Sequence, residues 1–311
     1  MFDSEKINTK TPQHPLLYEM MRSFVTLANS LNLSHAVDEL GSTRQTVRRH
    51  IGQLEESMGV PLFSVQDRRY ELTTEGEAAL PEAKLLLARG KAWLNREITM
   101  ADGLQHLTAQ KEDWVFFQQE QPLSEIWIND DNELIREAFR AWAMSGGEIE
   151  NKLMTHVRPF LIVFRHTAAG WVCTEFGEQS YYVAWFGKDF ARSSIGRPLR
   201  RMPAGEEFAV MLDEAFHRVE ATQSSRLDYV FTYMPKTEGG PAYPVKYQRL
   251  MMGGRFPDGS AAVLSMITPK SDLKIFGLDD ENLMEEIMKT QPKLKAVELK
   301  LEEISNAVNE G

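Results

Sequence analysis

The hydrophobic positions near the start of the chain repeat at helical spacing. Residues 16–31 place leucine, methionine and phenylalanine side chains three and four positions apart, which predicts an amphipathic helix. Residues 32–40 predict a shorter helix, with Asn32 or Ser34 as its cap. Gly41 follows at a position where glycine commonly ends a helix in the left-handed conformation. The pattern therefore predicts two helices and then a tight turn.

A third helix follows the turn, and its two sides differ in character. Ser42 or Thr43 is the expected N-cap, and Gly59 and Pro61 mark the end of the helix. The predicted buried stripe consists of Val47, Ile51, Leu54 and Met58. Gln45, Arg49 and Gly52 point away from this stripe, and Thr46 and Arg48 flank them.

The next segment predicts a small hairpin and a long helix. Residues 62–74 read as two short extended pieces around a polar tip at 66–69. Residues 74–104 then predict one continuous helix. Its apolar seam, with the three-four spacing of a helix that packs on a partner helix, consists of Leu80, Ala83, Leu87, Gly90 and Leu94.

Beyond about residue 110 the chain becomes richer in aromatic residues and mixes helices with strands. The predicted helices are 132–147, several short ones after residue 180, 205–224 and a C-terminal helical segment that is broken at Pro292. The predicted strands are 158–166, 170–177, 227–234, 243–253 and 260–268. This order does not alternate strand and helix as a doubly wound sheet would, so the fold class is α+β.

The composition and net charge exclude several classes of protein. No apolar run in the 311 residues approaches the roughly 18 that a membrane span needs, and the polar N-terminus lacks the apolar core of a secretory signal. The single cysteine, Cys173, excludes an internal disulfide and suits a reducing cytoplasm. The net charge of −10 argues against a surface that binds nucleic acid over its whole extent.

One short segment is basic although the chain as a whole is acidic. Arg44, Arg48 and Arg49 lie in a stretch with no acidic residue between Gly41 and Gln53. A helix that is anchored by an apolar stripe and turns arginines and amides outward can enter the major groove and meet phosphates and base edges. The sequence therefore predicts a local nucleic-acid contact on this helix.

The residues around that helix resemble the DNA-binding domain of LysR-type transcriptional regulators. The matching positions are Ala36, Leu40, Val47, Ile51, Leu54, Glu55, Gly59, Leu62, Phe63, Leu72, Thr73, Glu75 and Gly76. The resemblance covers residues 16–100, about a third of the chain. It implies a winged helix-turn-helix and a following helix that pairs with its mate in a dimer. Gly52 departs from the family, in which a basic residue is common at that position.

The resemblance and the helical wheel together name candidate DNA-binding residues. These are Thr43, Arg44, Gln45, Thr46, Arg48, Arg49, Arg68 and Arg69. Gln45 and Arg49 are expected to reach base edges. Arg44, Arg48 and the two arginines at the wing tip are expected to hold phosphates.

The aromatic half of the chain resembles a PAS-like sensory domain, which is an antiparallel five-stranded sheet flanked by helices. This resemblance covers about residues 125–270 and implies a small-molecule effector or a signal passed to a partner subunit. Aromatic side chains with an arginine suit an anionic or ring-shaped ligand. The candidate pocket residues are Trp171, Tyr181, Tyr182, Trp185, Tyr247 and Arg249.

No catalytic or metal-binding pattern accompanies these elements. The chain contains no G-x-S-x-G, H-E-x-x-H, Walker or dinucleotide-binding motif, so we expect no catalytic residues and no metal site. Cys173 lies within a predicted strand and reads as a small buried hydrophobe. We therefore predict no fixed cofactor.

Together these features predict a cytoplasmic transcriptional regulator that forms a dimer or a higher homo-oligomer. It is expected to bind double-stranded DNA and not to bind a membrane. RNA polymerase and a small-molecule effector are its further expected partners. The expected segments are a flexible N-terminus (1–15), the winged helix-turn-helix (16–75), a linker and dimerisation helix (76–105), the sensory domain (111–275) and C-terminal helices (279–309). Two alternatives remain: a protein-interaction adaptor that uses the helical seams, and an enzyme with a fused regulatory winged helix.

Overall fold

The computed structural model of the chain describes residues 15–66, 69–95, 98–111, 114–128, 132–270 and 273–278. It divides into two units, Met1–Leu87 and Ala88–Gly311. The expected flexible N-terminus up to residue 14 and the expected helices at 279–309 lie outside the described residues. None of the described helices is long and apolar enough to cross a membrane.

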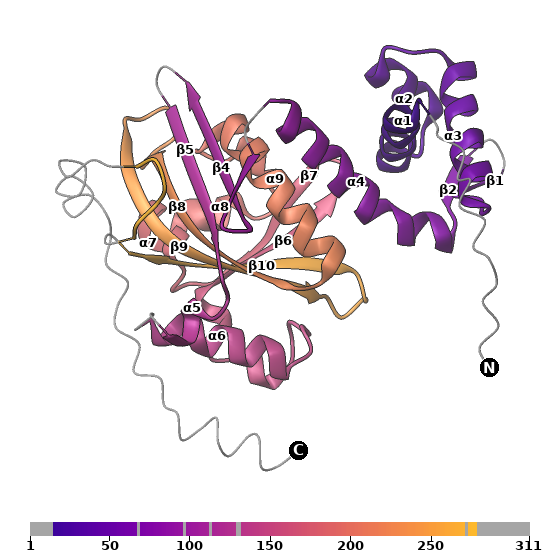
Figure 1. Ribbon diagram of the computed structural model, residues 1–311. Coiled ribbons are helices and arrows are strands. Elements are labelled where there is room, and N and C mark those ends of the chain that lie inside the picture. The colour runs from indigo at the N-terminus through magenta and orange to yellow at the C-terminus, as the bar shows by residue number, and fades with distance from the viewer. Residues whose placement is uncertain are drawn as a thin grey trace, which may run out of the picture. The chain divides into compact units, whose positions relative to one another are not determined.

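The N-terminal unit is a bundle of helices with a small hairpin (Figure 1). Its elements are α1 (Leu17–Ser30), α2 (Leu33–Leu40), α3 (Arg44–Met58), β1 (Phe63–Gln66), β2 (Arg69–Leu72) and the first part of α4 (Thr74–Leu94). One hydrophobic core joins α1, α2, α3, the start of the hairpin and α4. Its most buried side chains include Met20, Phe24, Leu27, Ala36, Val47 and Leu62. The predicted winged helix-turn-helix architecture is present.

The long helix α4 is shorter than the sequence pattern predicted. It ends at Leu94, and the chain continues into strands β3 (Ile98–Ala101) and β4 (Leu104–Lys111). The prediction of a linker helix to residue 105 was therefore wrong. Asp102 and Gly103 connect the two strands with positive φ angles of 53° and 78°. An Asp-Gly pair with this geometry is a strong signal for a two-residue hairpin turn, and it overrides the helical pattern.

The C-terminal unit is built on one antiparallel sheet of eight strands, in the order β3-β4-β5-β8-β9-β10-β6-β7. Its remaining strands are β5 (Trp114–Gln121), β6 (Leu161–Thr167), β7 (Gly170–Phe176), β8 (Ser225–Pro235), β9 (Ala242–Arg255) and β10 (Ala261–Pro269). The prediction of five strands was wrong because β3, β4 and β5 extend the sheet beyond β8. The C-terminal unit accordingly begins before residue 111, where the sequence placed its start.

Helices cover both faces of this sheet (Figure 1). One face carries α5 (Glu125–Ile128) and α6 (Glu133–Met144), whereas the other carries α7 (Tyr181–Phe186), α8 (Lys188–Ser194) and α9 (Gly205–Thr222). Three short 3₁₀ turns lie at Lys152–Met154, Arg158–Phe160 and Leu199–Arg201. The predicted order of two strands, short helices, a long helix and three strands is confirmed. The resemblance to a PAS domain stays a prediction that this order supports.

Alternating side chains create a separate hydrophobic core on each face of the sheet. On β9, Tyr247 and Met251 face α9, whereas Leu250 and Met252 face α6. This alternation is the period of two that a strand buried on both sides requires. Cys173 belongs to the core on the α9 side and is fully buried, as the sequence indicated.

Candidate DNA-binding interface and sensor cavity

The turn between α2 and α3 is set by side-chain caps and one glycine. Asn32 accepts hydrogen bonds from the backbone amides of Ser34 and His35, so it is the cap of α2. Gly41 ends α2 with a φ of 58°, a left-handed angle that glycine adopts without strain. Thr43 then caps α3, with its Oγ1 3.1 Å from the amide nitrogen of Thr46. Between the alternatives that the sequence left open, the structure selects Asn32 and Thr43.

The buried side of α3 holds the helix against the rest of the unit. Val47, Ile51 and Leu54 are buried, as predicted. Met58 is not part of this stripe because 46% of its side chain is exposed in the last turn of the helix. The sequence reading missed His50, which is buried on this side and lies 2.9 Å from the Ser23 hydroxyl of α1. This contact between α1 and α3 joins residues 27 positions apart, so the helical pattern alone gave no signal for it.

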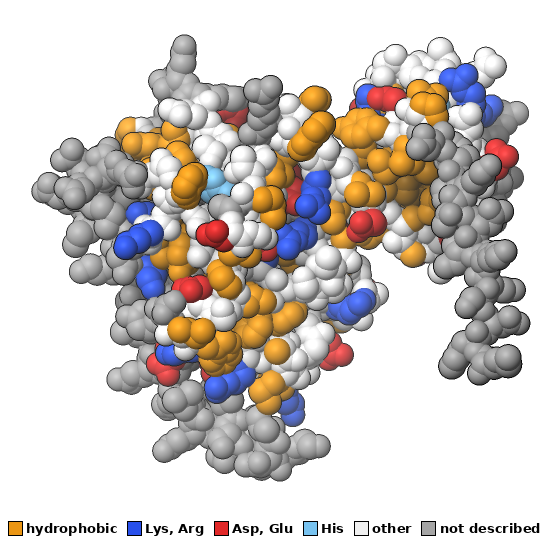
Figure 2. All heavy atoms as spheres, in the orientation of Figure 1, with side chains coloured by type: hydrophobic (Ala, Val, Ile, Leu, Met, Phe, Trp, Pro, Cys, Tyr) orange, Lys and Arg blue, Asp and Glu red, His pale blue; other side chains and the backbone are white. Residues whose placement is uncertain are grey.

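The opposite side of α3 presents the predicted reading residues to solvent. Arg44, Gln45, Arg48 and Arg49 are exposed, Thr43 is exposed beside them, and Thr46 is partly buried. Arg44 donates a hydrogen bond of 2.8 Å from Nη2 to the Ser34 hydroxyl, which ties it to the start of α2. Figure 2 shows basic side chains grouped at one edge of the N-terminal unit. The geometry therefore leaves a basic, amide-bearing surface on a firmly packed helix.

Gly52 lies on the same exposed side of α3 and leaves space around it. A Cβ atom built at this position would contact nothing within 4 Å. A larger side chain could therefore occupy the position without displacing any neighbour. This is the position that carries a basic residue in many members of the family that the sequence resembles.

The hairpin that follows α3 is anchored by a carboxylate from that helix. Glu55 Oε1 accepts hydrogen bonds of 2.7 and 3.1 Å from the backbone amides of Leu62 and Phe63. Strands β1 and β2 then pair in register from Phe63–Leu72 to Gln66–Arg69. Arg69 is exposed at the end of the hairpin, and Arg68 lies outside the described residues. Because Glu55 belongs to α3, the hairpin and the recognition helix are fixed to one another.

The C-terminal unit contains an apolar cavity between its sheet and helices α7 and α9. The cavity has a volume of about 80 Å³. Five of the six candidate pocket residues line it: Tyr181, Tyr182, Trp185, Tyr247 and Arg249. Trp171 does not line this cavity; its ring packs 5.2 Å from the rings of both Phe216 and His217. That these residues bind a ligand stays a prediction.

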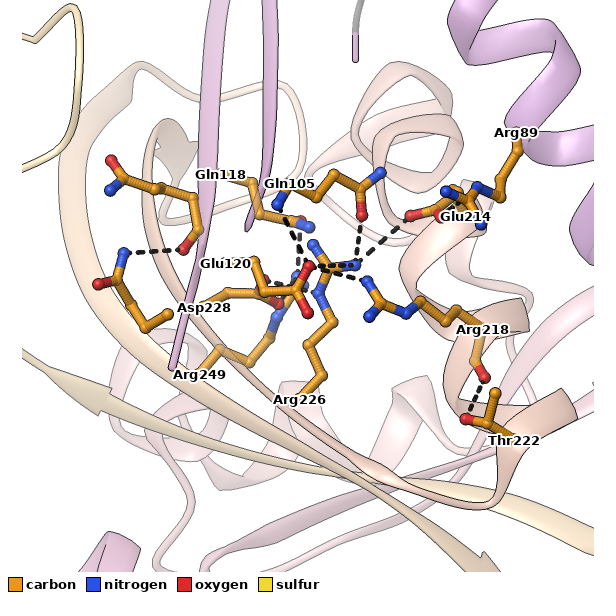
Figure 3. Close-up of polar contacts among 12 residues, drawn as sticks. Arg89, Gln105, Gln118, Glu120, Glu214, Arg218, Thr222, Arg226, Asp228 and Arg249 are labelled. Carbon is orange, nitrogen blue, oxygen red and sulfur yellow. Dashed lines mark hydrogen bonds and ion pairs between the residues drawn. The ribbon is translucent and has the colours of Figure 1, made fainter. Parts of the chain in front are cut away.

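A buried polar cluster adjoins this cavity (Figure 3). Arg226 lies at its centre and donates to Asp228 at 2.7 Å and to Gln105 at 2.6 Å. Arg249 donates from Nη2 to Gln118 at 2.7 Å and to Asp228 at 3.0 Å. Burial acts to lower the pKa of Arg226, but its three acidic neighbours outweigh that effect and raise it. Arg226 therefore remains charged inside the fold.

The cluster reaches from the sheet to helices α9 and α4. Glu214 of α9 is buried and lies 3.5 Å from Arg226 Nη1 and 3.6 Å from Arg89 Nε of α4. Glu120 of β5 pairs with Arg218 of α9 at 2.8 Å. The cluster could not be predicted from the sequence, because single charges on alternating strand positions are typical of solvent-facing residues. Only the pairing of β4, β5, β8 and β9 brings them together.

Comparison with known proteins identifies the N-terminal unit. The family described as bacterial regulatory helix-turn-helix protein, lysR family, matches residues 18–77. Residues 18–77 form a LysR-type helix-turn-helix domain. The match spans about a fifth of the chain.

Curated transcriptional regulators are similar to part of the chain. The HTH-type transcriptional regulator BudR of Klebsiella aerogenes is 36% identical over 84 residues, which cover 27% of this chain and 59% of BudR. The regulator CitR of Bacillus subtilis is 37% identical over 70 residues, covering 22% of this chain and 24% of CitR. The similarity therefore spans less than two thirds of either relative.

Solved structures that resemble the chain cover about a quarter of it. The complex of the CbnR DNA-binding domain with DNA is 26% identical and covers 25% of this chain and 91% of that chain, with a TM-score of 0.25. The oxidised form of OxyR from Corynebacterium glutamicum is 26% identical and covers 27% of each chain, with a TM-score of 0.26.

Proposed function

We propose that this chain is a sequence-specific transcriptional regulator that binds double-stranded DNA as a dimer. The observation that carries the proposal is the exposed basic side of α3 within a LysR-type domain. The named relatives are transcriptional regulators, which favours this function over that of an enzyme with a fused winged helix. Such a regulator acts in the cytoplasm, where it meets the chromosome and RNA polymerase.

The recognition step follows from the geometry of α3. The helix enters the major groove with Gln45 and Arg49 turned toward base edges. Arg44 and Arg48 flank them and contact phosphates, together with Arg69 and Arg68 of the hairpin. Thr43 and Thr46 at the start of the helix add hydroxyl contacts. The Ser34 hydroxyl holds Arg44 in place, so this phosphate contact needs little reordering on binding.

Dimer formation is assigned to helix α4. Three large apolar side chains remain exposed on it: Leu86 at 46%, Trp93 at 75% and Leu94 at 74%. Exposed apolar groups at this density on one helix indicate a protein contact. A second copy of α4 would place two recognition helices on one duplex and give a pseudo-palindromic site.

The sensory role is assigned to the C-terminal unit, where the aromatic-lined cavity is the effector site. The buried cluster connects Arg249 in the cavity wall with Arg89 on α4 through Asp228, Arg226 and Glu214. A ligand that shifts Arg249 would therefore act on a chain of ion pairs that ends on the helix assigned to dimerisation.

Replacing Arg49 by alanine tests the recognition step. If Arg49 pairs with guanine, the variant loses about 1–3 kcal/mol of binding free energy at the operator and little on random DNA. Arg22→Ala is the matched control, because Arg22 is a partly exposed arginine of α1 that pairs with Glu19. Equal loss on operator and random DNA would show that Arg49 contacts only phosphate. Unchanged binding by an Arg44, Arg48 and Arg49 triple variant would favour the adaptor alternative.

A further inference from the structure

On the face of the sheet that carries α5 and α6, one part of the hydrophobic core is incomplete within the described residues. It lies over β5 and β8, where Phe231 and Ile275 are buried. Five further apolar residues pack against them and are only half-buried: Val115, Phe117, Tyr229, Tyr233 and Leu278. These seven residues, which we call the β5–β8 patch, come from the two strands and from residues 273–278. No described helix contributes to this part of the core.

The alternation of side chains along β8 places the patch on the same face as α6. Leu227 packs in the core under α6, and Tyr229 and Phe231 follow it at the period of two that keeps side chains on one face. Phe117 lies opposite Phe231 in the register of β5 and β8, and so it shares that face. Helices α5 and α6 therefore cover one part of this face and leave the patch beside them.

The described chain ends on the patch. The backbone nitrogen of Phe276 donates a hydrogen bond of 2.9 Å to Gln119 Oε1 of β5. The Phe276 ring lies 5.7 Å from the ring of His106 on β4, and Leu278 packs in the patch itself. The residues that follow Leu278 are thus tethered at the patch, which gives them a high effective concentration there.

The sequence directly after Leu278 has the pattern of an amphipathic helix. Asp280 and Glu281 suit the first turn of a helix, and Pro292 marks its end. A helix of ten residues is about 15 Å long, which is about three spacings between neighbouring strands. The apolar residues on one side of its helical wheel are Leu283, Met284, Ile287 and Met288.

The charges of this segment and of the sheet face are complementary. Residues 279–291 contain five acidic side chains and one lysine. On the face of the patch, the described strand residues of β4, β5, β8, β9 and β10 include no acidic side chain. Lys246 lies opposite Phe231 on this face, and the backbone nitrogen of Lys270 donates to the carbonyl oxygen of Lys246 at 3.2 Å. Opposite charges across a contact favour its formation and fix its orientation.

From these observations we propose that residues 280–291 form a helix that packs on the β5–β8 patch of the same chain. The apolar side of the helix lies on the patch and buries the aromatic and aliphatic side chains that the described residues leave half-exposed. The acidic side faces solvent and the lysines at the edge of the patch. The segment is thereby an integral part of the C-terminal unit.

The reactivity of single introduced cysteines tests the docked helix. The only cysteine of the chain, Cys173, is buried, so an introduced thiol in the full chain is the accessible one. Ile287→Cys places a thiol on the apolar side of the helix. Lys289→Cys is the matched control, because it lies two residues further on and on the opposite side. We expect the thiol at 287 to react at least about tenfold more slowly than the thiol at 289 in the native chain, and equally fast in denaturant.

Two further variants test whether the patch provides this protection. Val115→Glu places a negative charge under an acidic helix, so it should abolish the protection at position 287. Val210→Glu is the matched control, because Val210 is 37% exposed on α9, on the opposite face of the sheet. A chain that ends at Leu278 leaves the patch unaltered. Thr108→Cys, opposite Phe117 in the register of β4 and β5, should react faster in this shortened chain than in the full chain.

Other outcomes overturn the proposal. Equal reactivity at 287 and 289 in the native chain would show that no helix is docked through its apolar side. Protection that survives Val115→Glu, or an unchanged rate for Thr108→Cys in the shortened chain, would show that the segment packs elsewhere. Loss of the protection after subunit exchange with an excess of the Val115→Glu chain would show that the segment packs on the patch of a second copy.

Discussion

Gly52 offers a direct way to test which side of α3 faces DNA. It lies on the exposed side of the helix, in register with Gln45 and Arg49. A Cβ atom at this position would have no neighbour within 4 Å, so a lysine fits without repacking. If this side meets the phosphate backbone, Gly52→Lys adds one cation to the contact. The variant should bind DNA more tightly at low salt.

The magnitude follows from counterion release. Each phosphate that is neutralised adds about −0.9 to the slope of log K against log salt concentration. Between 50 and 200 mM salt the lysine variant should therefore lose about 3.5-fold more affinity than the parent chain. Fluorescence anisotropy with a labelled duplex, measured at several salt concentrations, gives both slopes.

Gly52→Ala is the matched control. Both substitutions remove a glycine from the interior of a helix, and each should stabilise α3 by about 0.5–1 kcal/mol. Only the lysine changes the charge. If the two variants showed the same salt slope, position 52 would not lie near phosphates, and the assigned reading side of α3 would be wrong.

Three further predictions concern the stability and reactivity of the chain. Gly76→Ala should destabilise the N-terminal unit by about 1–3 kcal/mol in urea unfolding, because its Cβ would clash with the backbone carbonyl of Leu62; unchanged hydrogen exchange in α1–α3 would contradict this. Burial raises the pKa of the Cys173 thiol, so the native chain should react with a disulfide reagent only after unfolding. Burial also raises the pKa of Tyr247 to about 12, above an unfolded value of about 10. Its contribution to stability is therefore full below pH 10 and falls by about 1.4 kcal/mol per pH unit up to pH 12; Tyr247→Phe should remove that part of the slope in alkaline unfolding curves.

Local signals account for the parts of the fold that the sequence predicted well. Gly41 ends α2 and Thr43 begins α3 through contacts within a few residues. Their roles can therefore be predicted from the local sequence. Val47 and Ile51 follow the helical period and are buried accordingly. The outward direction of Arg49 follows from the same wheel. The exposed side of α3 could therefore be predicted from the sequence, and its contact with DNA stays a prediction.

The errors arose where distant residues decide the structure. Residues 98–111 have apolar positions that also fit a helix, but strand pairing with β5 and the Asp102–Gly103 turn make them a hairpin. The Asp-Gly pair could have predicted this turn from the sequence, but the helical spacing of the apolar residues was given more weight. Met58 was misplaced because the last turn of α3 extends beyond its neighbours.

The polar cluster marks the limit of what the pattern can predict. The strands that carry Arg226, Asp228 and Arg249 are buried on both faces. The residues next to them in the sequence do not indicate that these three side chains are buried. Their charges are tolerated only because strand pairing places each beside an opposite charge.

The central claim is that α3 makes this chain a sequence-specific DNA-binding protein. Its most direct test is selection of fragments from a genomic library by the full chain at moderate salt, with excess random DNA as competitor. We predict enrichment of fragments that share a pseudo-palindromic site with half-sites about one helical turn apart, and loss of that enrichment in the Arg49→Ala variant. Recovery of no fragment above background, even at low salt, would contradict the account.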